Sequence, residues 1–151
     1  MGLGRPNIPN RLNRHFTTLN LFEYDEETIK YVYKAILDFG FRDLPEKVKQ
    51  YSARIVNICV SLYKSVCKDY KPLPGKGHYL FNLRDLSKVV QGILSIHESE
   101  VTDNNVNLAS KFAKLISYES RRVFSDRFVD LKDKDHFTHI LRPIIGENMQ
   151  E

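Results

Sequence analysis

Apolar residues recur with helical spacing in four stretches of the chain. The first stretch begins after Asp25, which can cap a helix, and places Glu26 and Glu27 in the first turn, where negative charge suits the helix dipole. Gly40 is a typical residue at which such a helix ends. The apolar stripe of this first predicted helix consists of Ile29, Val32, Tyr33, Ile36 and Leu37.

Three further helices are predicted by the same spacing. The second begins near Pro45, a favourable first-turn residue, and runs to about Tyr70. The third starts around Asn82, with Asp85 three residues later in a capping arrangement. The fourth runs from about residue 106 to 129. Their apolar stripes are Tyr51, Ile55, Ile58, Cys59, Leu62 and Val66, then Leu86, Val89, Val90, Ile93 and Leu94, then Leu108, Phe112, Leu115, Ile116, Val123 and Phe128.

The two ends of the chain lack this periodicity. The first 14 residues are rich in Gly and Pro and predict a loop. Residues 15–22 are rich in aromatic and β-branched residues and predict one short strand, whose sheet we expect in sequence outside this chain. Pro143 interrupts the tail, where we expect at most a short helix over 136–141. The prediction is a mainly α fold, a bundle of about four helices preceded by a loop and one short β-strand.

Charge changes this picture only at the N-terminus. The net charge is +4, and residues 1–22 carry three arginines and no acid, so the remainder is nearly neutral. A nearly neutral body disfavours a nucleic-acid binder, which needs a basic face. No run of 18 apolar residues is present, so no membrane helix is expected. Cys59 and Cys67 lie in one helical stripe, too far apart for a disulfide within that helix, and are expected to be free thiols.

The chain lacks the usual catalytic motifs. Gly75-Lys76-Gly77 does not have the frame of a phosphate-binding loop, G-x-x-x-x-G-K-[ST], and is expected to be a turn. His136 and His139 have metal-type spacing but no third ligand nearby, so no metal site is expected.

The stretch 78–93, HYLFNLRDLSKVVQGI, is very similar to the lid of an axonemal-type dynein heavy chain. Residues 4–6 and 11–16 resemble the loop and strand that close the large AAA+ subdomain of that family. The similarity covers about residues 4–131, and the pattern looks most like the third module of the ring. It continues in the last predicted helix at Glu119, Arg122, Val123, Phe124, Asp126, Arg127 and Phe128.

The resemblance implies a division into three parts. Residues 1–22 would be the loop and last strand of the large AAA+ subdomain, residues 23–131 the helical lid, and residues 132–151 a tail or linker to the next module. The lid would sense nucleotide and transmit conformational change round the ring of an ATP-driven microtubule motor.

The resemblance also implies partners. The parent module would bind ATP or ADP with Mg²⁺, while the chain alone would be no enzyme and would hold no nucleotide tightly. Its partners would be the rest of the ring and, through the parent, microtubules and other dynein chains, with no nucleic acid and no membrane. It would be found in the cytoplasm and cytoskeleton, in the axoneme of a cilium or flagellum. The alternative is a free-standing helical protein-interaction module.

Three arginines are candidate site residues under this resemblance. Arg84 matches the sensor 2 position, which reads the nucleotide, and a guanidinium suits a phosphate because it is permanently charged and forked. Its alternative role is that of a surface arginine paired with Asp85 or another acid. Arg11, and less closely Arg14, match an arginine finger that acts on the neighbouring module. The alternative for both is pairing with acids or simple solvation.

Overall fold

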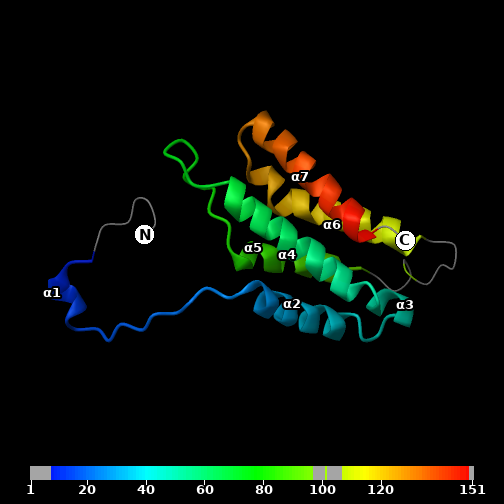
Figure 1. Ribbon diagram of the computed structural model, residues 1–151, viewed down its shortest axis with the longest axis horizontal. Helices are drawn as coiled ribbons and strands as arrows, with labels where there is room; N and C mark the ends of the chain where they lie inside the picture. Colours follow the sequence, from blue (N-terminus) through cyan, green and yellow to red (C-terminus); the bar gives the residue numbers. More distant parts are fainter. Residues whose placement is uncertain (1–7, 97–100, 102–106, 150–151) are drawn as a thin grey trace.

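The computed structural model describes residues 8–96, 101 and 107–149. The body consists of packed helices that run roughly side by side (Figure 1). Its long helices are α2 (Glu26–Gly40), α4 (Ser52–Asp69), α5 (Leu83–Leu94), α6 (Leu108–Val123) and α7 (Leu131–Met149). Short turns of helix are α1 (Asn10–Asn13), α3 (Glu46–Lys49) and the 3-10 turn η2 (Ser125–Arg127). The predicted mainly α fold is confirmed for the residues that the structure describes.

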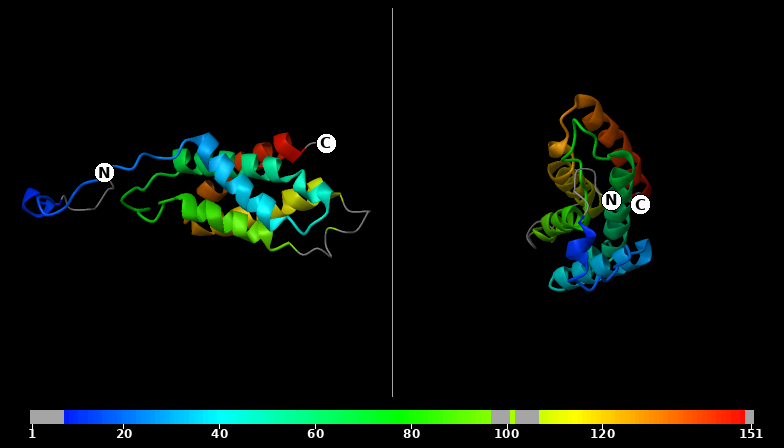
Figure 2. Two further views of the ribbon diagram at one scale, coloured as in Figure 1. Left: turned by 90° about the horizontal axis from the view of Figure 1, so that it is seen from below. Right: turned by 90° about the vertical axis from the view of Figure 1, so that its left-hand side faces the viewer.

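Helix α4 is the centre of the bundle. It packs against α2, α5, α6 and α7. Helix α2, by contrast, packs extensively against only two of the long helices, α4 and α5. The end-on view in Figure 2 shows α2 on one side of α4 and α7 on the other. This position requires apolar residues on more than one face of α4. The buried residues of α4 are Ser52, Ile55, Val56, Ile58, Cys59, Val60, Leu62 and Val66.

Aromatic rings fill one end of the core. Tyr70 stacks on Phe128 with ring centroids 4.3 Å apart, and Phe128 lies edge-on to Tyr79 at 5.4 Å. Phe81 and Phe137 contact the same Phe128 ring. Such ring pairs add to the hydrophobic burial that stabilises the fold. The cluster joins the segment between α4 and α5 to the C-terminal part of the chain.

Two of the predicted helix starts have the expected capping bonds. The Asp25 carboxylate accepts a hydrogen bond from the Thr28 N–H at 3.1 Å. At the start of α5, the Asn82 side chain accepts from backbone N–H groups and the Asp85 carboxylate accepts from the Asn82 N–H at 3.2 Å, which completes a capping box.

The predicted second helix is divided into α3 and α4. The interruption is a tight turn at Gln50 and Tyr51, where the Tyr51 N–H bonds the Val48 carbonyl three residues back at 2.9 Å. This turn buries Val48 and brings Tyr51 to Phe112, with ring centroids 5.5 Å apart. Packing therefore overrides the continuous helical periodicity at this point.

The predicted strand at residues 15–22 is not formed. These residues are exposed and have no regular structure beyond a turn and a bend at the start, and no described residue is in a strand. A strand needs a neighbour to complete its hydrogen bonds, and the described part of the chain offers none. The helix predicted to end near residue 129 ends at Val123 and is followed by η2.

The prediction for the tail was wrong. In place of a short helix, α7 runs from Leu131 to Met149 and includes Pro143. Pro143 is exposed, and a proline costs a helix one hydrogen bond and a clash with the preceding turn. The buried residues Phe137, Leu141 and Met149 lie on the other side of the helix. Their burial stabilises the helix on both sides of the proline.

Candidate functional site

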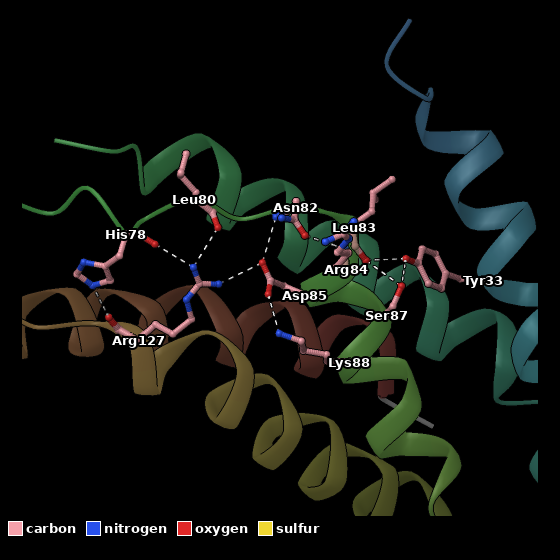
Figure 3. A network of polar contacts seen from close by, with 10 residues as sticks. All are labelled: Tyr33, His78, Leu80, Asn82, Leu83, Arg84, Asp85, Ser87, Lys88 and Arg127. Carbon is pink, nitrogen blue, oxygen red and sulfur yellow. Dashed lines mark hydrogen bonds and ion pairs between the residues drawn. The ribbon is translucent and has the colours of Figure 1, made fainter. Parts of the chain in front are cut away.

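Arg84 lies in the first turn of α5, and its surroundings are shown in Figure 3. Its backbone N–H donates to Asn82 Oδ1 at 2.9 Å, which fixes the turn. Its side chain is exposed and has no ion pair with any residue that the structure describes. Asp85, the acid next to it, pairs instead with Arg127 at 3.1 Å and with Lys88 at 3.5 Å. The alternative in which Arg84 and Asp85 form a surface pair therefore does not describe this structure.

Arg84 also lines a hollow of about 800 Å³ between the start of α2, the later part of α4 and the start of α5. The other cation in its wall, Lys64, pairs with Glu26, whose pKa is lowered to about 2 because Lys30 and Lys64 both donate hydrogen bonds to its carboxylate. Arg84 is thus the cation in this wall that forms no ion pair with a described residue, although the acid Glu23 lines the same hollow. The lining consists of Phe22, Glu23, Tyr24, Ile29, Tyr63, Lys64, Cys67, Phe81, Asn82, Leu83 and Arg84.

The start of α5 is also fixed from α2. The Tyr33 hydroxyl donates to the Leu83 carbonyl at 2.9 Å and lies 2.8 Å from Ser87 Oγ (Figure 3). Tyr33 is buried, so its ring anchors this contact in the core. The turn that carries Arg84 is therefore held on the side of α2 as well as by its own cap.

Arg127, in η2, is bonded to the segment that precedes α5. Its Nη2 donates to the carbonyls of His78 at 2.9 Å and Leu80 at 3.0 Å, and its guanidinium lies 4.6 Å from the centre of the Phe81 ring. His78 Nε2 lies 3.0 Å from the Arg127 carbonyl in return. Together with the pair to Asp85, these contacts make Arg127 the centre of the network in Figure 3.

A second set of contacts holds the same segment to α7. Lys76 pairs with Asp130 at 2.6 Å and Asp133 at 2.5 Å, and the Tyr79 hydroxyl donates to Asp133 Oδ2 at 2.8 Å. Partial burial would raise the pKa of Asp133, but the hydrogen bonds from Lys76 and Tyr79 outweigh it and lower the pKa. The Gly75-Lys76-Gly77 stretch forms turns, as predicted, and the Lys76 side chain forms ion pairs with Asp130 and Asp133.

Arg11 and Arg14 lie far from this site. Both are exposed, in and directly after α1, and Arg14 Nε donates to His15 Nε2 at 3.1 Å. Figures 1 and 2 show α1 at the end of an extended segment that stands apart from the helical body. Neither arginine forms an ion pair with a described residue. The structure therefore does not bring them together with Arg84.

Other candidate chemistry is limited. Among residues 8–96, 101 and 107–149, no group of three or more metal-ligating side chains lies together, and His136 lies 3.3 Å from Asp69. Cys59 and Cys67 are free, and burial raises the pKa of the Cys59 thiol to about 12. None of the described helices combines the length and apolar character needed to cross a membrane.

Sequence patterns did not give Arg127 or Tyr33 a part in this site. Their partners are 42 to 54 residues away along the chain, beyond the reach of any spacing rule. The only signal for Arg127 was its place among the residues of the last predicted helix that resemble a known family.

Comparison with known proteins agrees with that resemblance. Residues 30–134 match the family model described as dynein heavy chain, ATPase lid domain. The chain is 38% identical over 97% of its length to dynein axonemal heavy chain 6 of Homo sapiens, and 30% identical over 93% to dynein axonemal heavy chain 3 of Mus musculus. It is 31% identical over 96% to the dynein-1-beta heavy chain, flagellar inner arm I1 complex, of Chlamydomonas reinhardtii. It spans about 3% of the length of each of these relatives. The chain belongs to the dynein heavy chain ATPase lid domain family.

Proposed function

We propose that the chain is the nucleotide-sensing lid of an AAA+ module in an axonemal dynein heavy chain, and that Arg84 reads the nucleotide. One observation carries the proposal: Arg84 is exposed in the first turn of α5, lines the hollow, and has no ion pair with a described acid. A free guanidinium is a strong, forked donor for a phosphate.

The chemistry around Arg84 suits an anion. The neighbouring carboxylate of Asp85 is buried and already paired with Arg127, so its negative charge is largely compensated. The γ-phosphate of ATP would supply negative charge that Arg84 can bind, and ADP would lack it. Differential contact of this kind would favour the closed lid when ATP is bound.

The test is the preference of the intact heavy chain for ATPγS over ADP, measured by competition with a fluorescent nucleotide. Arg84→Ala should lower this preference at least about tenfold, because a hydrogen bond to a charged group contributes about 1.5–3 kcal/mol. The preference of Arg84→Lys should fall between those of the wild type and Arg84→Ala. The control is Arg121→Ala, which removes another exposed arginine that does not line the hollow. An unchanged preference in Arg84→Ala would refute the assignment.

The proposal includes the arrangement of the whole chain. Residues 1–22 would close the large subdomain, with residues 15–22 pairing as its last strand, residues 23–131 would be the lid, and residues 132–151 would lead to the next module. Arg11, or alternatively Arg14, would act as an arginine finger on the neighbouring module. Their position on an arm apart from the body is compatible with reaching another module. Replacing each by Ala in the intact heavy chain should lower ATP turnover only for the residue that serves as the finger.

The parent protein would be an ATP-driven motor on microtubules in the axoneme of a cilium or flagellum, using Mg²⁺ with ATP in its modules, and this lid would belong to its third module. The chain alone would have no ATPase activity, because no Walker A motif occurs in its sequence. Phosphate release by the purified chain, at a constant specific activity through successive columns, would contradict this.

A second candidate function is a free-standing interaction module. It is favoured by exposed apolar residues on the outer side of α2, where Tyr31 is 76% and Phe39 68% exposed. An immunoblot of the source cells separates the two. A band far above 17.7 kDa supports the lid of a motor, whereas a band near 17.7 kDa supports the interaction module.

A further inference from the structure

We propose that Arg127 is a positioning residue, which holds the turn that carries Arg84 to the C-terminal helices of the lid. This inference rests on the proposed nucleotide-sensing role of Arg84. Arg127 does not itself line the hollow and acts through Asp85 and the backbone.

The first step is a shared oxygen atom. Asp85 Oδ2 lies 3.1 Å from Arg127 Nη1 and also accepts the Asn82 N–H at 3.2 Å. The Asn82 side chain in turn accepts the Arg84 N–H at 2.9 Å. A short chain of bonds therefore leads from the Arg127 guanidinium to the backbone of Arg84, and the middle link is one carboxylate (Figure 3).

The second step is the burial of that carboxylate. Asp85 is only 5% exposed, and its other cation, Lys88, is more distant at 3.5 Å and largely exposed. A buried charge that loses its main partner is strongly destabilised. Without Arg127, Asp85 would turn toward water, and the same movement would break its bond to the Asn82 N–H. The capping box and the start of α5 would lose their fixed geometry together.

The third step is where Arg127 is attached. It lies in η2, which joins α6 to α7 and packs against both. Its two bonds to the carbonyls of His78 and Leu80 hold the approach to α5 as well as the helix start. Arg127 thus links the C-terminal helices directly to the turn that carries Arg84.

Lys76 provides a matched control. It holds the same approach segment to the start of α7 through Asp130 and Asp133, and its side chain is 25% exposed against 33% for Arg127. It makes no ion pair with α5. Lys76→Ala should weaken the packing of the segment and leave the Asp85 cap in place, whereas Arg127→Ala should remove the cap.

The first experiment measures amide hydrogen exchange on this chain without nucleotide. Arg127→Ala should speed exchange at the Arg84 and Asp85 amides about five- to tenfold more than Lys76→Ala does, which corresponds to the loss of about one hydrogen bond. Arg127→Lys can keep the charge beside Asp85, so its exchange rates at these amides should lie between those of the wild type and Arg127→Ala. If Arg127→Ala does not fold, Arg127→Lys is compared with Lys76→Ala instead. Equal exchange in the arginine and Lys76 variants would overturn the inference.

The second experiment measures the preference for ATPγS over ADP in the intact heavy chain. Arg127→Ala should lower it several-fold in the wild-type background and have little further effect in the Arg84→Ala background, because residues joined by one hydrogen-bond network couple in double-mutant cycles. Lys76→Ala should leave the preference unchanged. If Arg84→Ala lowers the preference and Arg127→Ala does not, or if the two effects multiply, Arg127 is not a positioning residue. If Arg84→Ala itself has no effect, the proposed function fails first.

Discussion

Gly92, in the last turn of α5, faces Glu119 of α6, and replacing it by alanine tests how tightly the two helices pack. A Cβ at position 92 would lie 2.0 Å from Glu119 Oε2, 2.2 Å from its Cδ and 2.8 Å from its Cγ. Comfortable contacts between such atoms begin at about 3.5 Å. The Glu119 side chain must therefore move by more than its tip.

The movement would break an ion pair in a confined place. Glu119 is 7% exposed, and its Oε2 accepts hydrogen bonds from Arg122 Nη2 at 2.6 Å and Nε at 2.9 Å. Overpacking costs about 1–3 kcal/mol and a lost bond to a charged group costs a similar amount, less here because Arg122 is half exposed. Alanine gains about 1 kcal/mol over glycine inside a helix. The expected net loss for Gly92→Ala is about 2 kcal/mol, or about 4–8 °C in Tm.

Urea or thermal unfolding followed by circular dichroism measures this loss, with two controls. Gly146→Ala, in α7, should stabilise the protein by about 1 kcal/mol, because a Cβ there meets no atom within 4 Å. In a Glu119→Ala background, Gly92→Ala should change sign and become stabilising, since the obstructing side chain is gone. A Gly92→Ala protein as stable as the wild type would refute the packing described for α5 and α6.

Three further predictions concern buried or paired groups. The Ser120 hydroxyl is buried with no hydrogen-bond partner among the described residues, so Ser120→Ala should leave stability unchanged or raise it by up to about 1 kcal/mol in urea unfolding, and a clear loss would contradict this. Cys59 is fully buried with its pKa raised to about 12, so it should not react with a thiol reagent such as DTNB until the protein unfolds; rapid native labelling, with Cys59→Ala as control, would show that the core opens. Glu26 has its pKa lowered from 4.5 to about 2 by Lys30 and Lys64, so it stabilises the fold above pH 4.5 and loses that contribution as the pH falls toward 2. Glu26→Gln should therefore be less stable than wild type at about pH 6, and a gap that persists at about pH 2 would exclude this origin.

The helices were predictable wherever one face of a helix meets the core. The residues Ile29, Tyr33 and Leu37 of the predicted first stripe are buried, and the stripes of α4, α5 and α6 are buried or half-buried throughout. The cap at Asp25 was also predictable, because its hydrogen-bond partner lies within one turn of the same helix.

The failures occur where the deciding contacts are distant in sequence. A proline and a weak apolar stripe argue against a long C-terminal helix, but α7 packs on α4, which lies more than sixty residues earlier. The strand pattern at residues 15–22 is a local preference, and the described chain supplies no partner to satisfy it. Arg84 could be named from a resemblance, whereas the pairing of Asp85 with Arg127 depends on a fold that no spacing encodes.

The segment between α4 and α5 is held by apolar burial and positioned by ion pairs. Its buried rings, Tyr70 and Tyr79, pack in the aromatic cluster and contribute hydrophobic burial that holds it to the core. Rings alone permit sliding, since their contacts are only weakly directional. The pairs of Lys76 with Asp133 and of Arg127 with Asp85 are directional; the first lies within the segment and the second in the first turn of α5 that follows it. The Lys76 pair fixes the register of the segment against α7, and the Arg127 pair fixes the start of α5, so the position of Arg84 depends on a residue more than forty positions downstream.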